Sequence, residues 1–179
     1  MTPEERVGVL KQLNCPSLLD ANDAARAIWK DPDPALERPV IRILRNGRNV
    51  HNRVEAAYAL GAMDGSARTI ALEGSLSDKS ESPKVRAFAA EALVVIHRKV
   101  THSVLLRNLE DSSAEVRFWC AYALGEIQER KALPTLRWLA ENDNRVVKGW
   151  WSVSKEARDA ITRIKRDRRR CCMSCGTRL

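Results

Sequence analysis

Apolar and small residues recur along this chain with the spacing of a buried helical face. In residues 85–93 they occupy the first, fifth, eighth and ninth positions, and residues 52–60 and 116–124 repeat this order closely. This spacing places the side chains on one stripe of an amphipathic helix. Two fainter copies, residues 20–28 and 153–161, extend the series. The pattern therefore predicts a row of related helices.

The copies return at a nearly fixed interval. Their leading small residue falls at positions 24, 56, 89, 120 and 157, so the steps are 32, 33, 31 and 37 residues. The last step is long because residues 145–151 are inserted before the final copy. Self-similarity at a period of about 20–50 residues is the sequence signature of stacked repeats.

A second apolar helix of different sequence lies between successive copies. Its last leucine recurs at positions 44, 76, 109 and 139. Each repeat is therefore predicted to be a pair of antiparallel helices, A then B, and one pair alone cannot bury both apolar faces. The expected fold class is all-α, an α-solenoid of about five antiparallel helix pairs.

Helix boundaries in the sequence agree with this fold. Residues 2–5 combine an N-cap threonine, a proline at the first helical position and a glutamate that closes a capping box. Residues 33–34 and 82–83 repeat the cap-then-proline signal. Gly61 and Gly125 follow the last leucine of their B helices, so both are predicted to be left-handed helix stops.

The B-helix wording Val-Arg-x-x-Ala-Ala-x-Ala-Leu-Gly, with an Asp or Asn shortly before it, resembles the short bacterial HEAT repeats, also called phycobilisome-lyase-like repeats. The resemblance covers roughly residues 3–165 and implies a HEAT-like superhelix whose B helices line the concave side. It is less specific for function, because such repeats serve scaffolds, chromophore lyases, a protein hydroxylase and DNA-repair proteins.

For the hydroxylase branch, the resemblance implies iron held by repeated His-Glu dipeptides. Here His51 precedes Asn, His97 precedes Arg and His102 precedes Ser, so we expect no such activity. The sequence also has no Gly-rich phosphate loop, nucleophile elbow or paired-carboxylate motif. We therefore expect a chain that is not an enzyme, needs no cofactor and has no evident small-molecule substrate.

Positive charge is concentrated at the C-terminal end. The chain has 31 Lys and Arg against 23 Asp and Glu, a formal net charge of +8. Seven of the basic residues and one acid follow residue 161, which leaves 24 basic against 22 acidic residues, or +2, in the body. We expect one α-solenoid domain over 1–165 and a flexible basic tail over 166–179. Without a leader or a membrane-length apolar run, the expected location is cytoplasmic, with no membrane contact.

Five cysteines without a secretion signal argue against a disulfide framework. Cys120 stands where other copies have alanine, so it is predicted to be buried. Cys171, Cys172 and Cys175 include the spacing of one zinc knuckle, but a closed zinc site needs four ligands and no second pair exists. We therefore expect no metal site, with these thiols as a weak candidate.

One arginine recurs at the same position of three copies, as Arg53, Arg86 and Arg117, and each follows a loop that contains Asp or Asn. A row of anion-binding groups would be the functional interpretation. Because the arginine belongs to the repeat template, we expect it instead to bond the loops and backbone of neighbouring repeats.

Aromatic residues gather on the face of the B helices opposite the buried stripe, where a repeat template would be polar. Two more aromatic residues, the tryptophans of the inserted segment, could bind a partner or cap the last helix pair. The predicted partner-binding set is Tyr58, Phe88, Phe118, Trp119, Tyr122, Trp150 and Trp151. Aromatic rings with interspersed acids are typical of protein-recognition surfaces.

The preferred hypothesis is a non-enzymatic scaffold or adaptor that binds a protein of unknown identity on the concave B-helix face. One alternative is a nucleic-acid-binding HEAT module that uses the basic residues near the C-terminus: Arg163, Lys165, Arg166, Arg168, Arg169 and Arg170. A modest basic cluster at residues 38–53 would support it. A second alternative, an accessory subunit of a chromophore-lyase-like system, rests on the resemblance alone.

Overall fold

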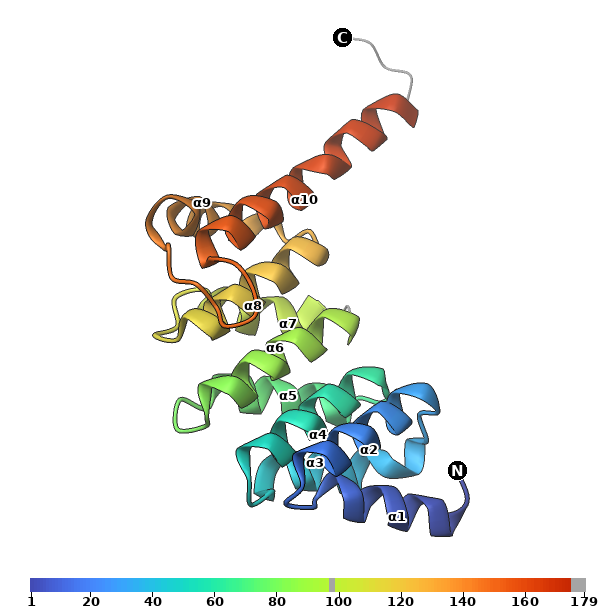
Figure 1. Ribbon diagram of the computed structural model, residues 1–179. Coiled ribbons are helices and arrows are strands. Elements are labelled where there is room, and N and C mark those ends of the chain that lie inside the picture. The colour runs from blue at the N-terminus through green and yellow to red at the C-terminus, as the bar shows by residue number, and fades with distance from the viewer. Residues whose placement is uncertain (97–98, 175–179) are drawn as a thin grey trace. The chain divides into compact units, whose positions relative to one another are not determined.

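The computed structural model describes the backbone of residues 1–96 and 99–174 and the side chains of 1–96 and 102–166. Within these ranges the chain forms ten α-helices and two short 3₁₀ turns (Figure 1). The α-helices are α1 (Pro3–Leu13), α2 (Leu18–Lys30), α3 (Glu37–Asn46), α4 (Val50–Ala62), α5 (Ala67–Ser77), α6 (Pro83–Ile96), α7 (Lys99–Asn108), α8 (Ala114–Glu126), α9 (Leu133–Asn142) and α10 (Val153–Ser174). The 3₁₀ turns are Pro34–Leu36 and Arg130–Ala132.

The chain divides into two compact units, an N-terminal unit, Met1–Val104, and a C-terminal unit, Leu105–Leu179. In the N-terminal unit α2, α4 and α6 pack side by side in one layer, while α3 and α5 pack together in the other. In the C-terminal unit α10 packs against both α8 and α9. Each unit therefore consists of stacked helix pairs, and the predicted all-α solenoid class is confirmed.

Small side chains let the B helices approach one another. Ala56, Ala57, Ala89 and Ala90 are fully buried in the N-terminal unit, as is Cys120 in the C-terminal unit. Alanine has the highest helix propensity and loses no side-chain rotamer freedom on burial, so it suits a close contact between helices. The prediction that Cys120 is a small buried hydrophobe is confirmed.

Helix capping follows the sequence at the N-terminal end. Thr2 and Glu5 form the predicted capping box of α1. Asp33 caps the 3₁₀ turn that leads into α3, and its side chain accepts a hydrogen bond from the backbone amide of Ala35. This hydrogen bond is the main cause of the lowered pKa of Asp33.

The two glycine stops were predicted wrongly. Gly61 and Gly125 lie inside the last turns of α4 and α8, and neither has a positive φ. At α4 the guanidinium of Arg68 donates to the carbonyls of Leu60 and Gly61, each 3.1 Å away, so the exposed helix end is satisfied by a side chain. At α8 the left-handed residue is Gln128, with φ of 56°.

Gly125 serves a different purpose, which is close helix packing. A Cβ atom at this position would lie 2.8 Å from both the Cα and the Cβ of Ala160 on α10. The glycine therefore allows α10 to cross α8 at this short distance.

The described residues form no strand, and their one isolated β-bridge joins Val146 to Ser152 in the segment before α10. No helix among the described residues is both long and apolar enough to cross a membrane. Helix α10 continues to Ser174, beyond the start of the predicted tail at residue 166. The tail's flexibility, the single domain over 1–165 and the cytoplasmic location stay predictions.

Candidate functional site

Two of the repeated arginines, Arg53 and Arg117, are structural, as predicted, and the third, Arg86, is buried. Arg53 donates from Nε and Nη2 to the two carboxylate oxygens of Glu81, both at 2.8 Å, and from Nη1 to the carbonyl of Gly47 at 2.8 Å. This carboxylate belongs to the loop of the following repeat, not to the Asp- or Asn-containing loop that precedes the arginine. A bidentate guanidinium contact of this kind ties consecutive repeats together.

Arg117 repeats this arrangement in the C-terminal unit. Its Nε lies 2.7 Å from Asp143, while its Nη1 donates to the backbone carbonyls of Asp111 and Ser112. Arg145 lies 3.1 Å from the other Asp143 oxygen. Burial alone would raise the pKa of Asp143, but the hydrogen bonds and charges of Arg117 and Arg145 outweigh it and lower the pKa. Both Arg117 and Asp143 are buried, so this ion pair shapes the fold rather than a surface.

Aromatic residues of the predicted binding face do come together in the C-terminal unit. The rings of Phe118 and Trp119 are 5.4 Å apart, Trp119 lies 5.5 Å from Tyr122, and Trp150 lies 5.3 Å from Trp119. The expected exposure of the central pair is wrong, because Phe118 is 1% and Trp119 6% exposed. The inserted segment before α10 folds over them, and a single helical pattern contains no sign of this cover.

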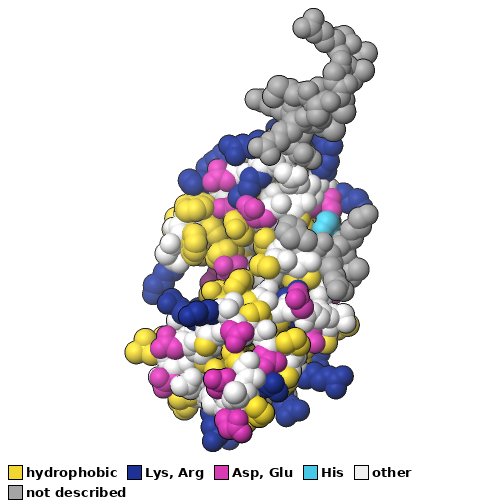
Figure 2. Space-filling model, turned by 90° about the vertical axis from the view of Figure 1, so that its right-hand side faces the viewer, with side chains coloured by type: hydrophobic (Ala, Val, Ile, Leu, Met, Phe, Trp, Pro, Cys, Tyr) yellow, Lys and Arg dark blue, Asp and Glu magenta, His cyan; other side chains and the backbone are white. Residues whose placement is uncertain are grey.

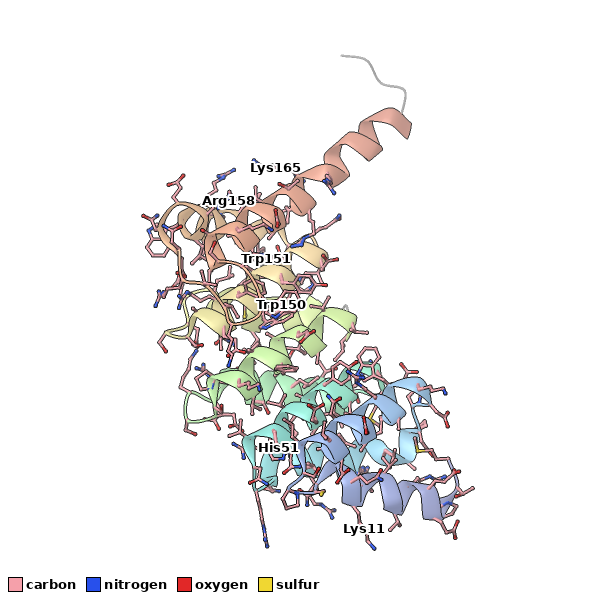
Figure 3. The ribbon with its side chains drawn as sticks, viewed as in Figure 1. Lys11, His51, Trp150, Trp151, Arg158 and Lys165 are labelled. Carbon is pink, nitrogen blue, oxygen red and sulfur yellow. The ribbon has the colours of Figure 1, made fainter. Side chains whose placement is uncertain are left out.

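Trp150 and Trp151 lie on that inserted segment (Figure 3). They remain 48% and 37% exposed while each ring lies 6.0 Å from that of Phe118, so they cover part of α8. A role in partner binding stays a prediction. A patch of hydrophobic side chains is visible on this part of the surface in Figure 2. Trp151 also donates from its indole nitrogen to the buried carboxylate of Glu156, at 2.9 Å.

Basic residues near the C-terminus fall into different environments. Arg163 pairs with Glu156 and, at 3.3 Å, with Glu126, so it is part of the fold of the C-terminal unit. Lys165 and Arg166 are exposed on α10. The side chains of Arg168, Arg169, Arg170, Cys171 and Cys172, and all of Cys175, lie outside the described residues.

Tyr58 and Phe88 belong to the N-terminal unit and are partly exposed. Tyr58 lies 5.0 Å from Trp29, whose indole nitrogen donates to the Tyr58 carbonyl at 2.8 Å. The sequence analysis missed Trp29, although it follows the first faint copy directly. On the same helix as Phe88, burial raises the pKa of the Glu91 carboxyl to about 7.

A cavity of about 520 Å³ lies in the C-terminal unit, on the side of α9. Its walls come from the loop after α7, from Arg117, from the start of α9 and from Arg145. Trp138 forms an aromatic wall and is 61% exposed. The Glu110 carboxylate, also on the wall, has no hydrogen bond or ion pair within the described residues.

Charged groups of both signs line this cavity. The carboxylates of Glu110 and Asp111 balance the guanidiniums of Arg117 and Arg145, and both arginines pair with Asp143, which lies outside the lining. Asp111 is buried whereas Glu110 is exposed, so Glu110 is the lining carboxylate most accessible to a ligand. This cavity could not be predicted from the sequence, because its lining residues come from separate loops and helices.

Metal ligands do not converge in the part of the chain that the structure describes. No three His, Cys, Asp or Glu side chains there could hold one ion. His51 lies in the first turn of α4 (Figure 3), and the next residue, Asn52, is fully buried and donates to the carbonyls of Leu13 and Cys15. The Asn after His51 thus has a structural role where a His-Glu dipeptide would place a carboxylate.

Comparison with known proteins found one repeat family and two named relatives that are similar to parts of this chain. Residues 75–153 match the family model described as HEAT repeats. A relative named Deoxyhypusine hydroxylase-B, from Oryza sativa subsp. japonica, is 36% identical over 124 residues, which cover 65% of this chain and 41% of the relative. A relative named Deoxyhypusine hydroxylase, from Arabidopsis thaliana, is 42% identical over 76 residues, which cover 42% of this chain and 24% of the relative. The chain thus spans about two fifths of the first relative and a quarter of the second.

The match shows that residues 75–153 are similar to HEAT repeats, and the paired helices agree with this similarity. The similarity to proteins named as enzymes contradicts the prediction of a non-enzymatic scaffold and the predicted absence of a small-molecule substrate. It equally gives no support to the nucleic-acid module or to the chromophore-lyase accessory subunit. The relatives come from plants, so the expected bacterial, phycobilisome-lyase-like branch is also corrected.

Proposed function

We propose that this HEAT-repeat chain is part of an enzyme of the deoxyhypusine hydroxylase type, and that its described residues contribute substrate binding. The sequence similarity to two proteins of that name carries the class of enzyme. The cavity beside α9 is the candidate site, because its volume of about 520 Å³ suits a small ligand.

Deoxyhypusine has chemistry that matches this cavity. It is a lysine whose side-chain nitrogen carries an aminobutyl group, so basic nitrogens are separated by hydrocarbon. An ammonium group is attracted to the face of a tryptophan ring and to a carboxylate. Trp138 and Glu110 offer these two groups on one cavity wall, and both are accessible. The apolar side chains of Leu109 and Pro134 line the same cavity and suit the hydrocarbon.

Iron, which the resemblance implies for the hydroxylase branch, does not fit the described residues. They contain no converging ligand set, and His51 is followed by an asparagine with its own structural role. No step through a metal is therefore assigned to these residues. The proposal concerns how substrate is held, which depends on Trp138, Glu110 and the cavity shape.

Titration of the purified chain with deoxyhypusine, followed by calorimetry, tests the proposal. We expect Glu110→Gln to weaken binding by about tenfold, since a charge-assisted hydrogen bond is worth about 1.5–3 kcal/mol. We expect Trp138→Ala to weaken it about threefold or more, through loss of the cation–π contact. Trp138 is mostly exposed, so its replacement should leave the fold intact.

Glu141→Gln is the matched control, because Glu141 is an exposed glutamate on the same helix as Trp138 and does not line the cavity. It removes the same charge and should leave the affinity within about twofold of native. Equal affinities for native, E110Q and W138A would reject the cavity, as would the absence of binding to the native chain.

A further inference from the structure

A second surface, in the N-terminal unit, carries three arginines without partners. Arg38, Arg42 and Arg45 lie on α3 at spacings of four and three residues, which place them on one stripe of the helix. All three are exposed, and none makes a hydrogen bond or ion pair within the described residues. Together they line a groove of about 470 Å³.

Several other arginines of the same unit are engaged. Arg6 pairs with Asp33 at 2.7 Å, Arg53 with Glu81 at 2.8 Å, and Arg68 donates to helix-end carbonyls. The carboxylate nearest in sequence, Glu37, accepts from the Arg68 backbone amide instead. Exposed arginines occur elsewhere in the unit, as at Arg26, but the three groove arginines line one groove together.

No carboxylate lines this groove, so its three positive charges are uncompensated. Like charges at these helical spacings repel one another and destabilise a helix slightly. A bound anion would remove this repulsion. Guanidinium groups bind phosphate and carboxylate oxygens with two parallel hydrogen bonds, so the stripe suits a ligand that carries more than one such group.

The opposite wall of the groove is apolar. Ile70 on α5 is 66% exposed there, next to Ala67, while Ile41 of α3 is nearly buried between the arginines. A ligand that filled the groove would cover Ile70 as well as the guanidiniums. Inorganic phosphate has no apolar part, so it would use only one of the two walls.

We propose that this groove binds a small organic polyphosphate, a ligand with at least two phosphate groups and an apolar or aromatic part. The phosphates contact Arg38, Arg42 and Arg45, and the apolar part covers Ile70. The groove lies in the N-terminal unit and its lining shares no residue with the cavity beside α9, so it is a separate site.

Calorimetric titration of the full chain with ATP, pyrophosphate and adenosine tests the site. We expect ATP to bind most tightly, pyrophosphate more weakly and adenosine not at all, because the charge provides most of the attraction. Raising the salt from 50 to 500 mM should weaken ATP binding, since exposed charges are screened.

Arg42→Gln removes the central guanidinium and should weaken ATP about tenfold or more. Arg26→Gln is the matched control, because Arg26 is an exposed arginine on α2 of the same unit, outside the groove. It should change the affinity by less than about twofold. Ile70→Ser should weaken ATP and leave pyrophosphate unchanged, which separates the apolar wall from the charged one.

Three outcomes would overturn the site. The first is no ATP binding at millimolar concentration, and the second is equal weakening by R42Q and R26Q, which would mean non-specific attraction. The third is equal ATP affinity in the native chain and R42Q. Each variant changes an exposed side chain, and a thermal melt of each confirms that it folds.

Discussion

Replacement of Gly125 by alanine tests the packing of the C-terminal unit most sharply. The added Cβ would lie 2.8 Å from the Cα and Cβ of Ala160, and 3.1 Å from Arg163 Nε. Ordinary contacts between such carbon atoms are about 3.5–4.0 Å. Because a backbone atom of α10 is among those too close, a side-chain rotation cannot relieve the clash, and α8 and α10 must move apart.

Two opposing effects determine how far Gly125→Ala changes the free energy of unfolding. Alanine is favoured over glycine in a helix by about 1 kcal/mol. Overpacking of a close contact costs about 1–3 kcal/mol, and we take the upper part of this range, about 2–3 kcal/mol, because backbone must shift. We therefore expect Gly125→Ala to lower the free energy of unfolding by about 1–2 kcal/mol, which corresponds to a fall of about 4–16 °C in the midpoint for a unit of this size.

Gly74→Ala is the matched control. Gly74 is an exposed glycine within α5, and a Cβ there would meet nothing within 4 Å. This variant should gain up to about 1 kcal/mol from helix propensity alone. Thermal and urea unfolding, followed by circular dichroism, compare the two. A G125A protein as stable as native, with G74A raised as expected, would refute the close crossing of α8 and α10.

Three further perturbations follow from the structure. Asp143→Asn leaves Arg117 buried without its carboxylate and should lower the free energy of unfolding at pH 7 by about 3 kcal/mol, measured in urea. Because the pKa of Asp143 is lowered in the fold, the stabilities of native protein and variant should converge as the pH falls through that pKa. A stability difference that stays constant into acid would contradict this role of the Asp143 carboxylate. Burial raises the pKa of Glu91 from 4.5 to about 7, so between these pH values the native fold holds a proton that the unfolded chain has released. The free energy of unfolding should therefore fall by about 1–2 kcal/mol as the pH rises through this window, after allowance for solvent screening. Glu91→Gln should abolish this fall. Trp151→Phe removes the indole donor to the buried Glu156 carboxylate and should cost about 1–3 kcal/mol by urea unfolding, whereas a neutral result would mean that water replaces the donor.

The repeat pattern predicted the fold because local composition and tertiary packing agree within it. The alanines at 56, 89 and 121 mark helices that must approach closely, and each is fully buried. A structural role was correctly predicted for Arg53 and Arg117, because a residue that recurs from repeat to repeat is expected to stabilise the repeat fold. The identity of the Arg53 partner, Glu81, could not be read, because it lies 28 residues away in a loop.

The burial of Phe118 and Trp119 and the cavity beside α9 were not predictable from local pattern. Helical periodicity assigns faces to one helix, whereas the cover over Phe118 comes from the segment that bears Trp150 and Trp151. The cavity wall at Trp138 and Glu110 likewise arises from a helix and a loop far apart in sequence. The prediction of a non-enzymatic chain was wrong because it rested on the absence of His-Glu dipeptides. Such dipeptides concern metal ligands alone and carry no information on substrate-binding residues.

The affinity of the native chain for deoxyhypusine relative to lysine tests substrate binding most directly. Both are amino acids with a basic side chain, and only deoxyhypusine has the aminobutyl extension that would reach Trp138 and Glu110 together. We predict that calorimetry gives a dissociation constant about tenfold or more lower for deoxyhypusine. Dissociation constants within about twofold of each other would contradict the assignment of this chain to substrate recognition.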